Sequence, residues 1–112
     1  THVSTIVGTP AFMAPEQARG DESVDARSDL FSLGCVIYYL CTGEVPFKAD
    51  STLGTLMALA VNTPPAPSSV NALVPCELSD LTLQLLEKDP SRRPQSAAVV
   101  VADLASLQQK LV

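Results

Sequence analysis

The sequence DARSDLFSLGCVIYYLCTG, residues 25–43, decides the fold. Its middle, LFSLGCVIYYL, is apolar but only about half as long as the roughly 20 residues that a membrane-spanning helix needs. The residues from Asp25 to Ser28 offer caps for a helix start, and Gly43 suits the left-handed residue after a helix end. Because nearly every face of such a helix, residues 26–42, is apolar, we expect it to be the buried, central helix of the fold.

Helical signals continue on both sides of this stretch. Pro15 is tolerated at a first helical position and predicts a short turn, which Gly20 and Asp21 end. Ser51 is a suitable cap for a helix over residues 51–61.

The last third of the chain predicts two more helices after a Pro-rich loop. Residues 63–69, TPPAPSS, are expected to contain no helix. Apolar residues then recur at helical spacing over residues 76–88 and 96–111; they are Leu78, Leu81, Leu85 and Leu86 in the first helix, and Val99, Val100, Leu104, Leu107 and Leu111 in the second. No window alternates with a period of two, so we predict an all-α bundle.

The composition excludes some functions. A net charge of -5 argues against nucleic acid or an anionic membrane as partner. Cys35, Cys41 and Cys76 have neither the spacing nor the histidine neighbours of a zinc site, so we expect reduced, buried thiols and no metal site. The chain starts at Thr1 without a leader, so we expect a cytoplasmic piece of a longer protein, with any membrane anchor outside it.

Four motifs, in a fixed order, resemble those of protein kinases. GTPAFMAPE, residues 8–16, resembles the end of the activation segment, which closes in Ala-Pro-Glu. DARSDLFSLG, residues 25–34, resembles the central helix of that family, and GEVPF, residues 43–47, resembles the turn after it. KDPSRRP, residues 88–94, resembles the loop before the last helix. The whole string looks most like the bacterial kinases of the eukaryotic-like type.

This resemblance implies a partial protein kinase domain over residues 1–112. The expected fold is the C-terminal, large lobe, from the activation segment through the last helix. Residues 1–19 would end the activation segment, residues 20–47 would form the central helix region, and residues 48–112 would supply the remaining helices.

The resemblance also implies roles for the first residues. Gly8, Thr9 and Pro10 would lie in the substrate-docking loop, where the Thr9 hydroxyl would hydrogen-bond the catalytic aspartate and its neighbouring lysine. A threonine there indicates Ser/Thr acceptors, although outside the motif Thr9 would be an ordinary turn residue. Thr5, and next Thr1, are candidate activation phosphosites, because a phosphate orders such loops by pairing with an arginine; the alternative is unmodified loop hydroxyls.

Three charged residues have implied structural roles. Glu16 and Arg93 would form a buried ion pair, the alternative being two solvated surface charges. Arg92 is the weaker partner, because the arginine of the family directly precedes the position of Pro94. Asp29 would anchor the catalytic loop by accepting hydrogen bonds from its backbone, or would act only as a charge at a helix N-terminus.

The sequence lacks the motifs that carry kinase chemistry. It contains no G-x-G-x-x-G, V-A-I-K, H-R-D or D-F-G. We therefore expect no catalytic, ATP-binding or metal-binding residue in this chain, which should be inactive alone, and ATP and Mg²⁺ as cofactors of the parent only. That parent would transfer the ATP γ-phosphate to Ser or Thr of protein substrates, and the chain would pack against the missing N-terminal half of its own domain. The alternative is a pseudokinase or a protein-docking module that binds through residues 51–61.

Overall fold

The computed structural model describes residues 10–22 and 24–111, and every regular element among them is helical. The elements are η1 (Pro10–Phe12), α2 (Pro15–Arg19), α3 (Ala26–Thr42), α4 (Thr52–Val61), α5 (Pro67–Val70), α6 (Cys76–Leu85), η2 (Pro90–Arg92) and α7 (Ala97–Leu111). The all-α expectation is therefore confirmed.

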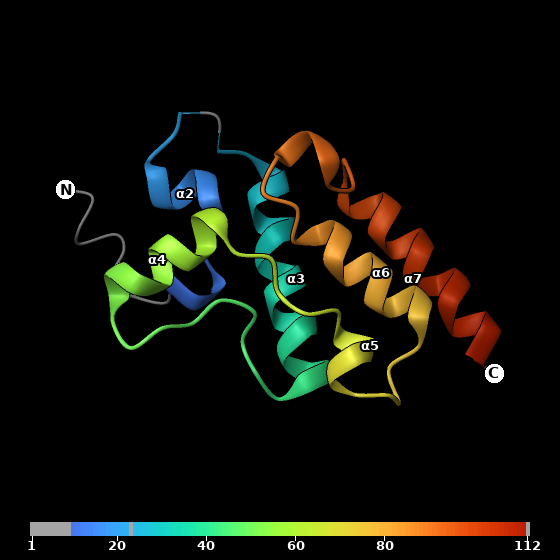
Figure 1. Ribbon diagram of the computed structural model, residues 1–112. Helices are drawn as coiled ribbons and strands as arrows, with labels where there is room; N and C mark the ends of the chain where they lie inside the picture. The colour runs from blue at the N-terminus through green and yellow to red at the C-terminus, as the bar shows by residue number, and fades with distance from the viewer. Residues whose placement is uncertain (1–9, 23, 112) are drawn as a thin grey trace.

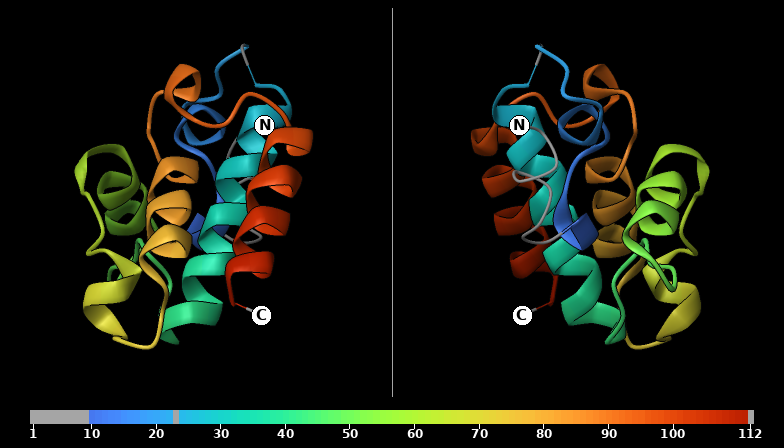
Figure 2. Two further views of the ribbon diagram at one scale, coloured as in Figure 1. Left: turned by 90° about the vertical axis from the view of Figure 1, so that its right-hand side faces the viewer. Right: turned by 90° about the vertical axis from the view of Figure 1, so that its left-hand side faces the viewer.

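Helix α3 is the centre of the arrangement (Figure 1), with α2 and α4 on one side and α6 and α7 on the other. Helix α6 runs opposite to α3, and α7 lies alongside both (Figure 2). Helix α3 begins and ends at the residues that its predicted caps indicate. The Asp25 side chain accepts a hydrogen bond from the Arg27 amide, and Gly43 takes a φ of 77° while its N–H donates to the Tyr39 carbonyl.

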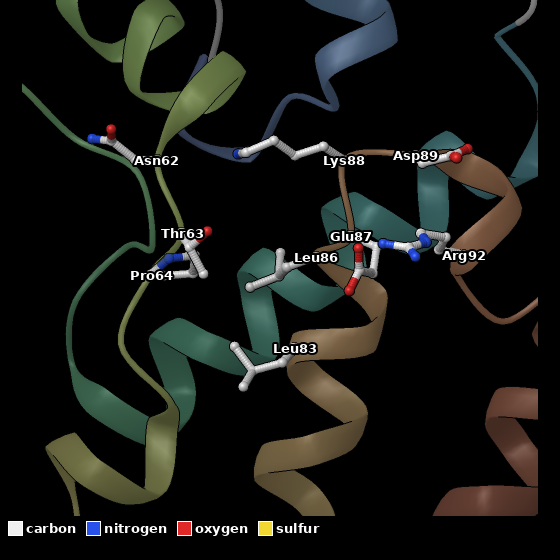
Figure 3. Close-up of a pocket in the computed structure, with 9 residues that line it drawn as sticks. All are labelled: Asn62, Thr63, Pro64, Leu83, Leu86, Glu87, Lys88, Asp89 and Arg92. Atoms are coloured by element: carbon white, nitrogen blue, oxygen red, sulfur yellow. The ribbon is translucent and has the colours of Figure 1, made fainter.

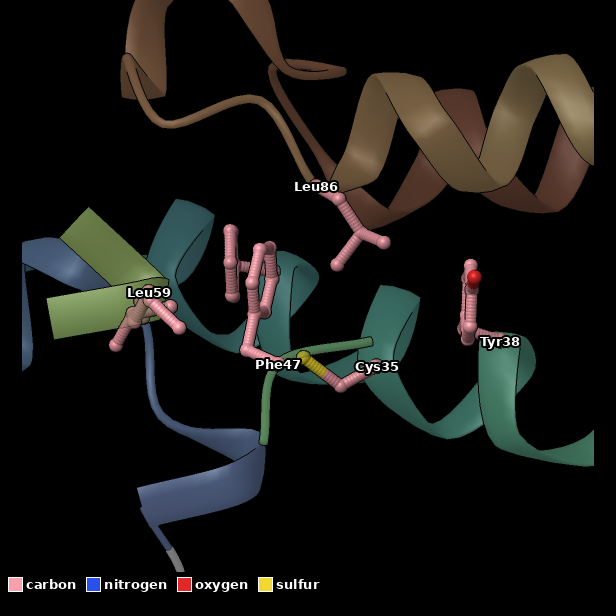
Figure 4. Packing of buried hydrophobic residues seen from close by; sticks show 8 residues of the cluster. Cys35, Tyr38, Phe47, Leu59 and Leu86 are labelled. Carbon is pink, nitrogen blue, oxygen red and sulfur yellow. The ribbon is translucent and has the colours of Figure 1, made fainter. Parts of the chain in front are cut away.

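Two hydrophobic clusters hold the helices together. The larger one joins α3 to α4, to the turn after α3 and to the end of α6 (Figure 4); it contains Ala14, Phe31, Cys35, Tyr38, Phe47, Ala58, Leu59 and Leu86. Within it, the rings of Phe31 and Phe47 stack with their centroids 5.9 Å apart. The second cluster joins α3, α6 and α7 through Leu30, Leu81, Leu85 and Val100.

The structure corrects two predicted element boundaries. Residues 63–69 were expected to contain no helix, yet α5 begins within them, because Pro67 occupies the first helical position and needs no hydrogen-bond acceptor there. Helix α6 ends at Leu85 rather than Lys88, because the Glu87 amide donates to the Gln84 carbonyl three residues back and so leaves the α-helical pattern. The carbonyls of Glu87 and Lys88 then accept hydrogen bonds from the Arg93 side chain.

Three burial expectations were also wrong in part. The central helix is not buried on every face, because Leu33, Val36, Tyr39 and Leu40 are exposed. Only Cys35 among the three thiols is buried, while Cys41 is half-buried and Cys76 is exposed. In α7 Val100 and Leu107 are buried and Leu104 packs against the second cluster, but Val99 is exposed.

Gly34 allows α3 and α6 to approach closely. A Cβ atom at this position would lie 2.8 Å from the Leu85 Cβ, which is too near the α6 backbone to move away alone. We expect Gly34→Ala to lower the free energy of unfolding by about 1–3 kcal/mol, since overpacking outweighs the helix propensity that alanine adds.

Urea unfolding of the full-length protein measures this change. Leu40→Ala is the control on the same helix, because that side chain is 76% exposed and its loss should cost at most about 0.5 kcal/mol. Unchanged stability in Gly34→Ala would show that the two helices separate without cost.

Candidate functional site

The site begins at α2, a single helical turn that presents an acid to the core. Pro15 occupies its first position, and the Ala14 amide donates a 2.9 Å hydrogen bond to the Gln17 side chain, which fixes the turn. Glu16 follows Pro15 and is 1% exposed. A buried carboxylate is unfavourable unless it is paired and hydrogen-bonded.

The structure brings Glu16 together with Arg93, which lies 77 residues further along the chain. Arg93 Nη1 lies 2.6 Å from Glu16 Oε2, and Arg93 Nη2 lies 2.9 Å from Glu16 Oε1. Two parallel N–H···O bonds of this kind fix direction as well as distance. Because Arg93 is only 2% exposed, water competes little for either partner.

The rest of the Arg93 guanidinium is also satisfied. Its Nε donates to the Glu87 carbonyl at 2.7 Å, Nη1 also donates to the Arg27 carbonyl at 2.9 Å, and Nη2 to the Lys88 carbonyl at 3.3 Å. With the two bonds to the carboxylate, all five N–H donors of the side chain have acceptors. The face of the guanidinium lies 4.9 Å from the centre of the Phe31 ring. Arg93 therefore connects the loop after α6, the start of α3 and α2.

Ser28 completes the network and was missed as a site residue by the sequence reasoning. It was read only as part of a capping region, but Asp25 forms the cap, and the Ser28 hydroxyl donates a 2.6 Å hydrogen bond to Glu16 Oε2. Its full burial is the sign of this role, because a buried hydroxyl needs a partner. Nothing in the sequence identified Glu16 as that partner.

The network sets the charge of Glu16. Burial alone would raise the pKa of this carboxyl, but hydrogen bonds from Arg93 and Ser28 outweigh it and lower the pKa from 4.5 to about 2. Glu16 is therefore ionised at any physiological pH.

Other expected site residues are not assembled in this way. Asp29 is exposed at the start of α3, and its carboxylate has no hydrogen-bond partner within residues 10–22 and 24–111. Pro10 begins η1, whose end is fixed by a 2.6 Å hydrogen bond from the Ser32 hydroxyl to the Phe12 carbonyl. The remaining candidates, Thr1, Thr5, Gly8 and Thr9, lie outside the described residues.

A second cation, Lys88, was not singled out from the sequence. Its Nζ donates a 2.6 Å hydrogen bond to the Leu59 carbonyl and lies 4.4 Å from the centre of the Phe47 ring. Partial burial lowers the pKa of its ammonium group. The side chain extends over a pocket whose interior is lined by Leu83 and Leu86 (Figure 3).

The described part of the chain offers no metal site, since it contains no group of three or more His, Cys, Asp or Glu side chains suited to hold an ion. None of the described helices is both long enough and apolar enough to span a bilayer.

Comparison with known proteins identifies the family. Residues 1–104 match the family described as "Protein kinase domain". The chain is 43% identical to the serine/threonine-protein kinase PknB of Mycolicibacterium smegmatis over 109 residues, covering 97% of this chain and 17% of that protein. It is 44% identical over 100 residues to the DNA damage-responsive serine/threonine-protein kinase RqkA of Deinococcus radiodurans, covering 89% of this chain and 15% of the relative. The chain thus spans about a sixth of the length of these relatives.

A solved structure agrees with the sequence comparison. The twitchin kinase region from C. elegans superposes with a TM-score of 0.71 at 30% identity, covering 78% of this chain and 15% of the other. The family expected from the motifs is confirmed: the chain belongs to the protein kinase family, as part of a kinase domain similar to those of bacterial serine/threonine kinases.

Proposed function

We propose that this chain is the substrate-docking and scaffold part of a kinase that transfers the ATP γ-phosphate to Ser or Thr of proteins. The observation that carries the proposal is the Glu16–Arg93 pair, which ties α2, the turn that closes the activation-segment motif, to the helical core. Phosphoryl transfer depends on positioning and charge stabilisation rather than on covalent chemistry of the protein. A rigid attachment of this segment is the contribution that such a scaffold makes.

In this proposal, the first residues of the chain bind the protein substrate that accepts the phosphate. Gly8, Thr9 and Pro10 form the docking loop, with the Thr9 hydroxyl orienting the catalytic groups toward an aliphatic acceptor. Residues 1–19 end the activation segment, and phosphorylation at Thr5 or Thr1 orders it. Pro10, the last of these three residues, begins η1, and the Ser32 hydroxyl holds the end of that turn through the Phe12 carbonyl.

The other kinase functions belong to the rest of the domain. ATP and Mg²⁺ are the cofactors that the family implies, and we assign their binding to residues outside this sequence, in the cytoplasm where ATP is available. Asp29 has an exposed carboxylate at the start of α3, which leaves it free to accept hydrogen bonds from a catalytic loop supplied by that other part.

A protein-docking role without catalysis is the second candidate, and α4 favours it. This helix buries Thr55, Ala58 and Leu59, and it presents Leu53, Met57 and Val61 to solvent. These three apolar side chains are 68%, 61% and 75% exposed. Such an apolar face is typical of a surface that contacts another protein.

One assay separates the two functions. The full-length protein is incubated with ATP, Mg²⁺ and a protein acceptor, and phosphoserine and phosphothreonine are measured; the isolated 112-residue chain is tested in parallel. We expect phosphorylation by the full-length protein and none by the isolated chain. Acceptor binding without phosphorylation by the full-length protein would favour the docking module, and activity of the isolated chain would refute the proposal.

A further inference from the structure

The C-terminus of α4 depends on a side chain from another part of the fold. The last carbonyls of a helix have no partners within it and are usually satisfied by a glycine cap or by a basic residue in the last turn. Helix α4 has neither, because Asn62 at its end has an extended backbone and its own last turn contains no basic residue. Lys88 supplies what is missing, since its ammonium group donates to the Leu59 carbonyl at 2.6 Å.

Lys88 is itself held in place at both ends. Its ammonium group lies over the face of Phe47, a ring that is 2% exposed and stacked on Phe31. Its backbone carbonyl accepts a hydrogen bond from Arg93, the residue that binds Glu16. Figure 3 shows the side chain extended from its loop across the pocket toward α4. Lys88 therefore connects the end of α4 to the same loop that anchors the Glu16–Arg93 pair.

Helix α4 in turn packs against η1 and α2. Phe12 and Met13 lie against the cluster that contains Ala58 and Leu59, two buried residues of α4. A shift of α4 would therefore move the surface on which Pro10–Phe12 rests.

From these contacts we propose that Lys88 is a positioning residue for acceptor binding: it fixes α4 and, through α4, the η1 end of the docking loop. The proposal rests on the function proposed above and adds a residue to it. Lys88 touches neither acceptor nor nucleotide in this scheme. Its removal should therefore weaken binding of the acceptor and leave the nucleotide site as it is.

The test uses Lys88→Met in the full-length protein, which keeps most of the side-chain length and removes the charge and the donor. We expect the KM for the acceptor protein to rise about tenfold, the size of effect that follows from losing one charge-assisted hydrogen bond. The kcat and the KM for ATP should stay at wild-type values. Lys88→Arg retains a cationic donor over the ring and should recover most of the acceptor affinity.

Lys48→Met is the matched control, because it removes the same charge from an exposed lysine that pairs with Glu44 on the surface. Its acceptor KM should equal that of the wild type. A fall in kcat in Lys88→Met in proportion to a loss of folded protein, with an unchanged acceptor KM, would show a general structural role and overturn the proposal.

Hydrogen exchange on the same variants decides the inference independently of activity. We expect faster exchange in peptides covering residues 52–62 and 11–13 of Lys88→Met, with α7 unaffected. Wild-type exchange in both peptides would refute the positioning role, whether or not the protein phosphorylates anything. An inactive wild-type protein with the expected exchange would count against the proposed kinase function alone.

Discussion

Replacing Arg93 with methionine is expected to lower the free energy of unfolding by about 3–5 kcal/mol, because it leaves the Glu16 carboxylate buried without its partner. The side chain is 2% exposed and makes five hydrogen bonds, to the loop after α6, to the start of α3 and to α2. Methionine fills much of the volume of the arginine side chain, but it carries no charge and donates none of these hydrogen bonds. Since whole domains are stable by only about 5–15 kcal/mol, this is the largest effect that we expect from a single replacement here.

A double-mutant cycle tests whether the interaction between Glu16 and Arg93 causes this loss of stability. Glu16→Gln, Arg93→Met and the double variant are compared by urea unfolding of the full-length protein. Unfolding is monitored by hydrogen exchange in α3 peptides, so that the measured transition is that of this part of the protein. The double variant should be less destabilised than the sum of the two single variants, because neither charge remains buried alone. Additive effects would show that the two side chains act independently.

Arg19→Met provides the matched control on the surface. Arg19 pairs with Asp21 at 2.8 Å, but the two side chains are 55% and 35% exposed. Exposed pairs contribute about 0–1 kcal/mol, so the same change of residue type should cost far less at this position. A comparable loss would mean that removal of any arginine, rather than of the buried one, destabilises the protein.

The helices could be predicted from the sequence because their signals are local. The cap at Asp25, the left-handed Gly43 and the cap at Ser51 are each used as expected. The burial of individual side chains was harder to predict, because it depends on which helices pack against one another. The apolar run of α3 does not reveal that Leu40 is 76% exposed, and only the tertiary packing shows which of two neighbouring valines in α7 faces the core.

Residues of the site could be predicted only where the family resemblance assigns them a contact. Glu16 and Arg93 belong to motifs of the family, so the resemblance could pair them although they lie far apart in the sequence. Ser28 and Lys88 also lie within motifs of the family, but the resemblance assigned neither of them a contact, and their partners are a distant carboxylate and a distant backbone carbonyl. Contacts of that kind follow from the packing of α2, α3, α4 and α6 and are not encoded by spacing along the chain.

The same pair predicts how stability depends on pH. The pKa of Glu16 falls from 4.5 to about 2 on folding, so as the pH drops the unfolded chain binds this proton before the folded protein does. The contribution of the carboxylate is therefore fully present above about pH 4.5 and is lost as the pH falls toward 2. A shift of this size corresponds to about 3 kcal/mol.

Urea unfolding of the wild type and of Glu16→Gln between pH 7 and pH 3 isolates this contribution. Other acids with lowered pKa values, Asp25, Glu44 and Asp89, are exposed and are the same in both proteins, so their titration cancels in the difference. At pH 7 the wild type should be the more stable protein, and its advantage should shrink by about 2 kcal/mol between pH 7 and pH 3, mainly below about pH 4.5, as protonation removes the charge that the glutamine variant already lacks. Parallel curves for the two proteins would show that Glu16 titrates in the folded state as it does in the unfolded chain. In that case the hydrogen bonds from Arg93 and Ser28 would not be holding its charge.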